Sequence, residues 1–182
     1  MEDLTIENVV ASASIAEDLD LWDVYEALDG SEYDPDKFPG LIYKLDEPNT
    51  SLLLFSSGQL VCTGGVTPEE PQKSVGKMKK RLNENGIETA DEVEAEVQNI
   101  VASFNLNTDL NLNSVAISLG LEKVEYEPEQ FPGLVYRLQD SPVVLLMFGS
   151  GKVVCTGGKN EEQLREGIEN VKEELNKSGL YS

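Results

Sequence analysis

The order of apolar and polar positions predicts a definite succession of strands and helices in the first half of the chain. Residues 4–14 are rich in β-branched and small side chains, which is typical of a strand. Residues 18–29 place apolar side chains at the spacing of one helix face, which predicts a short amphipathic helix. The inward residues of this helix are expected to be Leu21, Val24, Tyr25 and Leu28.

Three strands and a long helix are expected next. Pro-Asn and Ser-Gly pairs mark the turns between the strands. The strands are expected over residues 40–46, 51–55 and 59–63. Thr67 is the expected N-cap of the long helix, with Pro68 at its first position, and Gly86 should end it.

The same succession occurs a second time. The segment from Phe38 to Gly65 reappears from Phe131 to Gly158 at a constant offset of 93 residues (131 − 38 and 158 − 65). In the second half the first strand is expected to start near Val97, with helices over residues 112–119 and 161–176. Two copies of this length predict one fold built from two similar halves, residues 1–91 and 92–182.

Three motifs occur in the chain, each with a close second copy: Asn-Val-Val-Ala-Ser, Phe-Pro-Gly-Leu-Val-Tyr-Arg-Leu and Leu-Leu-Met-Phe-Gly-Ser-Gly-Lys-Val-Val-Cys-Thr-Gly-Gly. These doubled motifs resemble the TATA-box-binding protein family over nearly the whole chain, and the abrupt start of the first copy is similar to archaeal members. The resemblance implies an α+β fold, a saddle with two-fold pseudo-symmetry. In that fold one curved antiparallel sheet carries four helices on its convex face.

Strand alternation collects uncharged and mostly apolar residues on one face of the expected sheet. In the first half these are Asn8, Val10, Ser12, Leu53, Phe55, Val61 and Thr63. In the second half they are Asn99, Val101, Ser103, Leu146, Phe148, Val154 and Thr156. If the helices cover the opposite face, this face is exposed, and an apolar surface of that size is typical of an interaction site.

The minor groove of A/T-rich DNA suits such a face, because its floor presents only acceptor atoms to which amide and hydroxyl groups can donate. The resemblance implies that paired phenylalanines wedge into base steps at each end of the site and kink the duplex. These are Phe38, Phe55, Phe131 and Phe148. Without the resemblance, core aromatics are the better interpretation of the four rings, although Phe38 and Phe131 precede Pro-Gly, which suits a loop tip better than a core strand.

Charged positions at the sheet margin are expected to contact phosphates. By resemblance these are Lys44, Arg137 and Lys152. Gln59 stands where the second copy has Lys152, and Glu7 stands where it has Gln98, so the first half has one cation fewer and a carboxylate near the phosphate path. Ordinary solvated surface charge is the alternative reading of these positions.

Partners also follow from the resemblance. Transcription factor B would contact the second-half loop at Gln139, Asp140 and Ser141, and RNA polymerase would be recruited through factor B. A homodimer of the DNA-free protein is a further expectation. Five cations make the first long helix basic, which could receive an acidic partner, although a solvated helix face explains them as well.

The composition limits the other possibilities. A chain of 182 residues with 40% hydrophobic content can bury a substantial core, and no apolar run reaches the length of a membrane span, so a cytoplasmic protein is expected. The net charge of −20 should repel nucleic acid at long range. Because the acid is spread along the chain, it predicts a protein adapted to a salt-rich, halophilic cytoplasm, where screening weakens that repulsion.

The sequence gives little support for a catalytic or metal-binding function. The chain has no histidine, and Cys62 and Cys155 fall on the inward faces of their strands, where small core residues are expected. No enzyme, cofactor or metal is therefore expected. The predicted function is a general transcription initiation factor that binds and bends A/T-rich promoter DNA. The alternative is a saddle-fold module whose apolar sheet face binds a protein.

Overall fold

The computed structural model describes residues 4–181 and divides into two compact units. The N-terminal unit is Asn8–Gln98. The C-terminal unit is formed by residues 99–181 together with residues 4–7 at the start of the chain. The two units have the same topology, a strand followed by a short helix, a three-stranded meander and a long helix.

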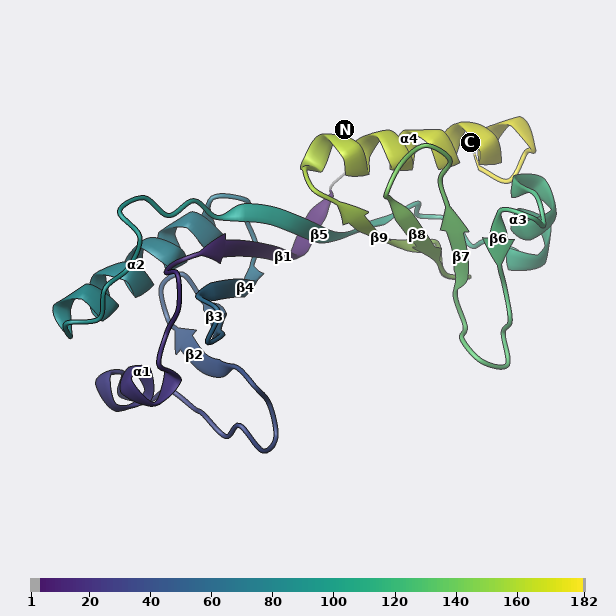
Figure 1. Cartoon of the computed structure of the whole chain (residues 1–182). Coiled ribbons are helices and arrows are strands. Elements are labelled where there is room, and N and C mark those ends of the chain that lie inside the picture. Colours follow the sequence, from purple (N-terminus) through teal and green to yellow (C-terminus); the bar gives the residue numbers. More distant parts are fainter. Residues whose placement is uncertain (1–3, 182) are drawn as a thin grey trace. The chain divides into compact units, whose positions relative to one another are not determined.

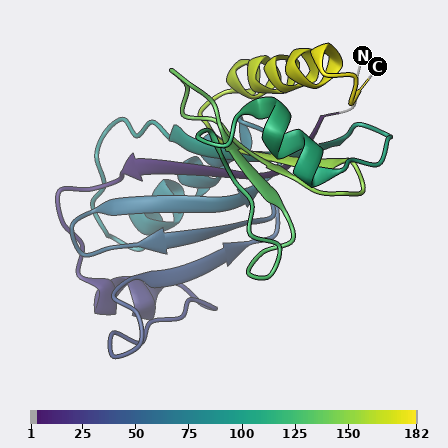
Figure 2. The same ribbon diagram turned by 90° about the vertical axis from the view of Figure 1, so that its right-hand side faces the viewer.

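The N-terminal unit contains a four-stranded antiparallel sheet in the order β2-β3-β4-β1. Its elements are β1 (Thr5–Ser14), α1 (Leu21–Ala27), β2 (Leu41–Leu45), β3 (Thr50–Leu54), β4 (Gln59–Gly65) and α2 (Glu70–Glu84). Figure 2 shows these strands broadside, with α2 behind them. One face of this sheet is therefore covered by the long helix.

The C-terminal unit repeats this arrangement and adds a short edge strand, β6, so that its strand order is β5-β9-β8-β7-β6. Its elements are β5 (Glu96–Asn105), α3 (Leu112–Leu119), β6 (Val124–Glu125), β7 (Leu134–Arg137), β8 (Val144–Met147), β9 (Lys152–Gly158) and α4 (Glu161–Lys177). The helix α4 packs against β9, as Figure 1 shows. Among residues 4–181, no helix is both long and apolar enough to cross a lipid bilayer.

The core of each unit lies between its sheet and its long helix. In the N-terminal unit the inward residues of β3 and β4 pack with Val75, Met78 and Leu82 of α2. In α4 the equivalent positions are Leu164, Ile168, Val171 and Leu175, which are all buried. Burial of a leucine or methionine side chain contributes about 1.5–3 kcal/mol, so these rows of apolar residues hold each helix to one sheet face.

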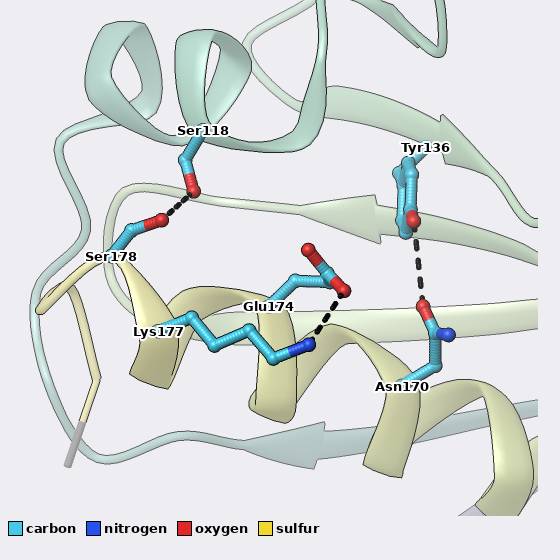
Figure 3. Close-up of polar contacts among 6 residues, drawn as sticks. All are labelled: Ser118, Tyr136, Asn170, Glu174, Lys177 and Ser178. Atoms are coloured by element: carbon cyan, nitrogen blue, oxygen red, sulfur yellow. Dashed lines mark hydrogen bonds and ion pairs between the residues drawn. The ribbon is translucent and has the colours of Figure 1, made fainter.

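Polar contacts join α4 to β7 and α3 and stabilise its own last turn, and Figure 3 shows them. The Tyr136 hydroxyl of β7 donates to Asn170 Oδ1 at 3.4 Å. Ser178, just after α4, is hydrogen-bonded to Ser118 of α3, and Lys177 forms an ion pair with Glu174 at 3.6 Å. Burial, followed by the nearby Glu174 carboxylate, raises the pKa of Tyr136, so this hydroxyl keeps its proton as donor.

The predicted start of the long helix in the first half is wrong. Thr67 is not the N-cap, because α2 begins at Glu70, with Pro71 in its first turn. The Glu70 carboxylate accepts the backbone N–H of Val66 at 2.6 Å, which fixes the chain one turn later than the Thr-Pro pair suggests. In contrast, α3 spans the predicted residues 112–119, and α4 extends only one residue beyond the prediction.

The short helix α1 also differs in detail from its prediction. Tyr25 does not face the core, because 42% of its surface is exposed and its ring packs edge-on against Trp22 at a centroid distance of 6.0 Å. Leu21, Val24 and Leu28 are buried as predicted. The helix spans Leu21–Ala27, with Leu28 as its C-cap, and is therefore shorter at both ends than the predicted residues 18–29.

Both cysteines are buried free thiols, which confirms their inward placement. Burial raises the pKa of Cys62, and burial raises the pKa of Cys155 to about 12. Because only the thiolate reacts with thiol reagents, both residues should label slowly at pH 8 in the native protein and quickly in denaturant. A colorimetric thiol assay in the two conditions measures this. Rapid labelling without unfolding would contradict the assignment of the sheet faces.

Candidate nucleic-acid interface

Each sheet has a second face that its long helix does not cover, and we call it the open face. In the N-terminal unit it comprises Asn8, Val10, Ser12, Leu53, Phe55, Val61 and Thr63, which are all partly exposed. In the C-terminal unit it comprises Asn99, Val101, Ser103, Leu146, Phe148, Val154 and Thr156, which are partly exposed as well. The intervening residues are buried, among them Leu52, Leu54 and Cys62. The two faces predicted from strand alternation are therefore confirmed.

The strand register sets the open-face residues in rows across each sheet. Ser12 pairs with Val61, and Val61 pairs with Leu53. Leu53 in turn pairs with Ile42 of β2, a partly exposed residue absent from the predicted set. Its counterpart in the C-terminal unit is Val135, which pairs with Leu146. The alternation of Leu41, Ile42 and Tyr43 is the sequence signal that could have identified both residues.

The asparagines at the start of the open face are held in a defined orientation. Asn8 Oδ1 accepts the backbone N–H of Gly64 at 2.7 Å, and Asn99 Oδ1 accepts that of Gly157 at 2.6 Å. Gly64 and Gly157 have φ values of 98° and 94°, a region that favours glycine, and this backbone turns their N–H groups toward the amides. Each Asn carbonyl oxygen therefore already accepts a hydrogen bond from within the protein.

This anchoring leaves the amide nitrogens as the donors of the open face. Asn99 Nδ2 lies 3.2 Å from Thr156 Oγ1, which uses one of its two hydrogens and leaves the other. Thr63 Oγ1 lies 3.4 Å from Asn8 Oδ1, so each asparagine forms a small cluster with the threonine of the adjacent strand. The clusters present N–H groups from a mostly apolar surface, which complements a ligand that offers acceptor atoms.

The predicted phenylalanine pairs are brought together in the structure. Phe38 and Phe55 pack edge to face with ring centroids 5.9 Å apart, and Phe131 and Phe148 repeat that distance. Phe38 and Phe131 are 37% and 40% exposed and lie in loops, so neither is a core aromatic. The core reading of these two rings is therefore wrong.

A glycine makes room for each ring pair. A Cβ atom at Gly133 would lie 2.8 Å from the Phe131 ring and 2.9 Å from the Phe148 ring, and Gly40 is placed in the same way beneath the first pair. Such contacts are far closer than packed carbon atoms allow. The glycine of each Phe-Pro-Gly motif thus allows the two rings to pack over it without being displaced, a role that the motif alone does not reveal.

The predicted phosphate-contacting cations are exposed. These are Lys44, Arg137 and Lys152. Arg137 forms an ion pair with Glu125 of β6 at 3.6 Å, so part of its charge is already balanced within the protein. Glu7 is exposed, and its Oε1 accepts the hydroxyl hydrogen of Ser103 at 2.7 Å. The open face therefore offers few cations and has a carboxylate beside it.

The predicted partner loop lies between β7 and β8. Gln139 and Asp140 are exposed, and Asp140 adopts a φ of 58°. The Ser141 hydroxyl oxygen accepts the backbone N–H of Val143 at 3.2 Å, which holds the end of the loop against β8. The loop thus presents two polar side chains on a fixed turn.

The family model described as "Transcription factor TFIID (or TATA-binding protein, TBP)" matches residues 3–85 and 94–178, one stretch in each repeat. By class, the protein is thus a transcription initiation factor, of a kind that binds promoter DNA and is not an enzyme. A solved structure, Methanococcus jannaschii TBP, is 43% identical, covers 96% of this chain and 99% of its own, and aligns with a TM-score of 0.86. That alignment confirms the predicted α+β fold class.

Similar relatives span almost the same length. A TATA-box-binding protein of Picrophilus torridus is 53% identical over 99% of this chain and 98% of its own. One of Thermoplasma acidophilum is 54% identical, over 98% and 97%. The chain belongs to the TATA-binding protein family. A relative from Haloarcula marismortui is less similar, 49% identical over 98% and 96% of the two chains, so the comparisons do not support the predicted salt-adapted origin.

Proposed function

We propose that this protein binds the minor groove of A/T-rich promoter DNA with its two open faces and kinks the duplex with its phenylalanine pairs. The orientation of Asn8 and Asn99 supports this proposal most directly. Their carbonyl oxygens are committed to glycine N–H groups, so their amides can only donate outward. The groove floor over A·T pairs presents only the acceptors A N3 and T O2.

The apolar members of the open face fit the same ligand. Sugar edges in the minor groove offer apolar surface to side chains such as Val61 and Val154, and the residues that make up the open faces are uncharged. Guanine would place an amino donor against the anchored amide donors, which discriminates against G·C pairs near Asn8 and Asn99. The proposed role thus combines apolar contact with selection for A/T-rich sequence.

Binding to matched duplexes tests this function. Fluorescence anisotropy in concentrated potassium chloride would compare an A/T-rich box with a box of equal length in which G·C pairs replace the central pairs. We expect the substituted box to bind more weakly, by about 1–3 kcal/mol per replaced pair. Equal binding of both duplexes, or none, would contradict the proposal and favour a protein as the ligand of the open faces.

The phenylalanine pairs supply the proposed kink. An apolar side chain that enters a base step unstacks it and bends the duplex. Replacing Phe131 by alanine should sharply reduce bending, measured by energy transfer between dyes at the duplex ends. The melting temperature should change little, because this ring is 40% exposed.

Phe104 provides the matched control for that variant. It is a buried phenylalanine of β5, so its replacement by alanine should cost about 3–5 kcal/mol of unfolding free energy. Comparing the two alanine variants thus distinguishes a ring that bends DNA from a ring that stabilises the core. If Phe131→Ala lowered stability as much as Phe104→Ala and left bending by the folded fraction intact, the ring would not be a wedge.

Further partners follow from the family and remain part of this proposal. The loop of Gln139, Asp140 and Ser141 would receive transcription factor B, which in turn would recruit RNA polymerase. Two exposed polar side chains on a fixed turn support a protein contact there. The DNA-free protein would form a homodimer through its open faces, which hides their apolar surface, and would act in the cytoplasm at the nucleoid.

A further inference from the structure

Two equivalent serines of the open faces are hydrogen-bonded with opposite polarity. Ser12 pairs with Val61 of β4, and Ser103 occupies the same position of its repeat, paired with Val154 of β9. In the N-terminal unit Gln98 Nε2 donates to Ser12 Oγ at 2.9 Å. In the C-terminal unit Ser103 Oγ donates to Glu7 Oε1 at 2.7 Å. The repeat is therefore symmetric in position and asymmetric in hydrogen bonding.

The direction of each bond decides what the serine can offer to a ligand. A serine hydroxyl has one hydrogen and two acceptor lone pairs. Ser12 receives a hydrogen from Gln98, so its own hydrogen can be donated. Ser103 gives its hydrogen to Glu7, and an ionised carboxylate can only accept. At this position the N-terminal unit presents a donor, whereas the C-terminal unit presents acceptors.

The minor groove distinguishes these two arrangements. A·T pairs present acceptors alone, and a G·C pair adds the guanine amino donor. An acceptor of the protein that faces an acceptor of the groove is unfavourable, because neither atom supplies a hydrogen. The Ser12 position is therefore matched to A·T pairs, and the Glu7–Ser103 pair is matched to the amino group of guanine.

We propose that Glu7 makes the two halves of the bound DNA site unequal and so sets the direction in which the protein lies on it. In the half of the site bound by the C-terminal unit, a G·C pair is tolerated opposite Ser103. In the other half, an A·T pair is required opposite Ser12. This inference rests on the proposed function, because it assumes that the open faces lie in the minor groove.

The two residues can be exchanged with almost no change in shape, which makes the test direct. Glu7→Gln gives both units an amide, Gln98→Glu gives both a carboxylate, and the double variant reverses the assignment. Both side chains are exposed, so the variants should fold normally. The full-length protein would be used with a palindromic A/T-rich box and with the same box carrying one G·C pair in one half.

Orientation can be read from the natural fluorescence of the chain. Trp22 is its single tryptophan and lies in the N-terminal unit. Energy transfer from Trp22 to an acceptor dye at one end of the duplex reports which way the protein lies. The ratio of affinities for the two boxes reports base preference, and it cancels any uniform effect of removing a charge.

The wild type should bind the substituted box in one direction, with the C-terminal unit over the G·C pair. Glu7→Gln should remove this preference and weaken binding to the substituted box relative to the A/T box by roughly 5- to 150-fold, as expected for a mismatched pair. Gln98→Glu should tolerate the G·C pair in either direction. The double variant should reverse the direction of energy transfer.

Three outcomes would overturn the inference, and they are distinguishable. If the wild type binds the A/T-rich box but Glu7→Gln leaves both the affinity ratio and the orientation unchanged, Glu7 has only a structural role and the proposed function stands. If the double variant binds in the wild-type direction, another residue sets polarity. If the wild type binds no duplex at any salt concentration, the proposed function falls together with this inference.

Discussion

Replacing Asn8 and Asn99 by aspartate together should reduce affinity for an A/T-rich duplex by roughly 30-fold to more than 10⁴-fold, on the basis of about 1–3 kcal/mol for each hydrogen bond to a base that is removed. Aspartate keeps the oxygen that accepts the glycine N–H, and it removes the amide hydrogens. It also places a carboxylate against the groove acceptors. The sheet should therefore survive while its ability to donate disappears.

The choice of aspartate separates binding from stability. Alanine at position 8 would also leave the N–H of Gly64 without the acceptor that it has at 2.7 Å, which costs about 1–3 kcal/mol for a buried group and less for an exposed one. A loss of affinity in an alanine variant could then arise from a distorted strand. With aspartate the melting temperature should stay close to that of the wild type, measured by circular dichroism.

A charge control completes this experiment. Asn83 of α2 and Asn113 of α3 are exposed asparagines outside the open faces, one in each unit. The pair Asn83→Asp and Asn113→Asp adds the same two charges without touching the donors. Anisotropy in concentrated potassium chloride should show near wild-type affinity for this control. Equal losses in both double variants would assign the effect to charge and exclude the asparagines from base contact.

Local periodicity was enough to predict the open faces, because alternation in a strand depends only on neighbouring residues. Val61 and Thr63 could be assigned to one side and Cys62 to the other without knowing what lies above or below them. The repeat then supplied an independent check, since Val154, Cys155 and Thr156 follow the same order. The sheet face on which such strand residues lie can therefore be predicted without knowing any contact between distant parts of the chain.

The features that define the chemistry of the site could not be predicted in this way. The amide of Asn8 is oriented by Gly64, which lies 56 residues away, and Ser103 is paired with Glu7, 96 residues away. The pairing of β1 with β4 is also irregular, because between Val9 and Ala11 one residue of β1 opposes two residues of β4. The extra residue lies in β4, where the alternation of β1 cannot reveal it.

Affinity for A/T-rich DNA should hold or increase as potassium chloride rises from about 0.1 M to about 1 M, the reverse of an ordinary DNA-binding protein. Each phosphate neutralised releases condensed cations and gives a log–log slope of about −0.9. Three contacts, from Lys44, Arg137 and Lys152, would thus weaken binding by roughly 500-fold over that range. Two properties of this chain oppose that trend.

The first is the net charge of −20, whose repulsion of DNA is screened by salt. The second is the composition of the open faces, whose apolar contacts require no release of ions and are strengthened by excluded salts. Arg137 is moreover paired with Glu125 at 3.6 Å, so its contact with a phosphate competes with an internal partner. Cations taken up between carboxylates and phosphates would replace the usual release of cations.

Replacing acidic residues far from the open faces tests whether repulsion by the acidic surface or contact with phosphates dominates the salt dependence. Glu162, Glu166 and Glu173 are exposed on α4, the helix on the covered face of its sheet. Replacing all three by glutamine should improve binding at low salt, where repulsion is unscreened, and should change little near 1 M. Anisotropy titrations of both proteins across a salt series measure this. Tightest wild-type binding at the lowest salt, with a steep negative slope, would show that phosphate contacts dominate and that the acidic surface does not control the encounter.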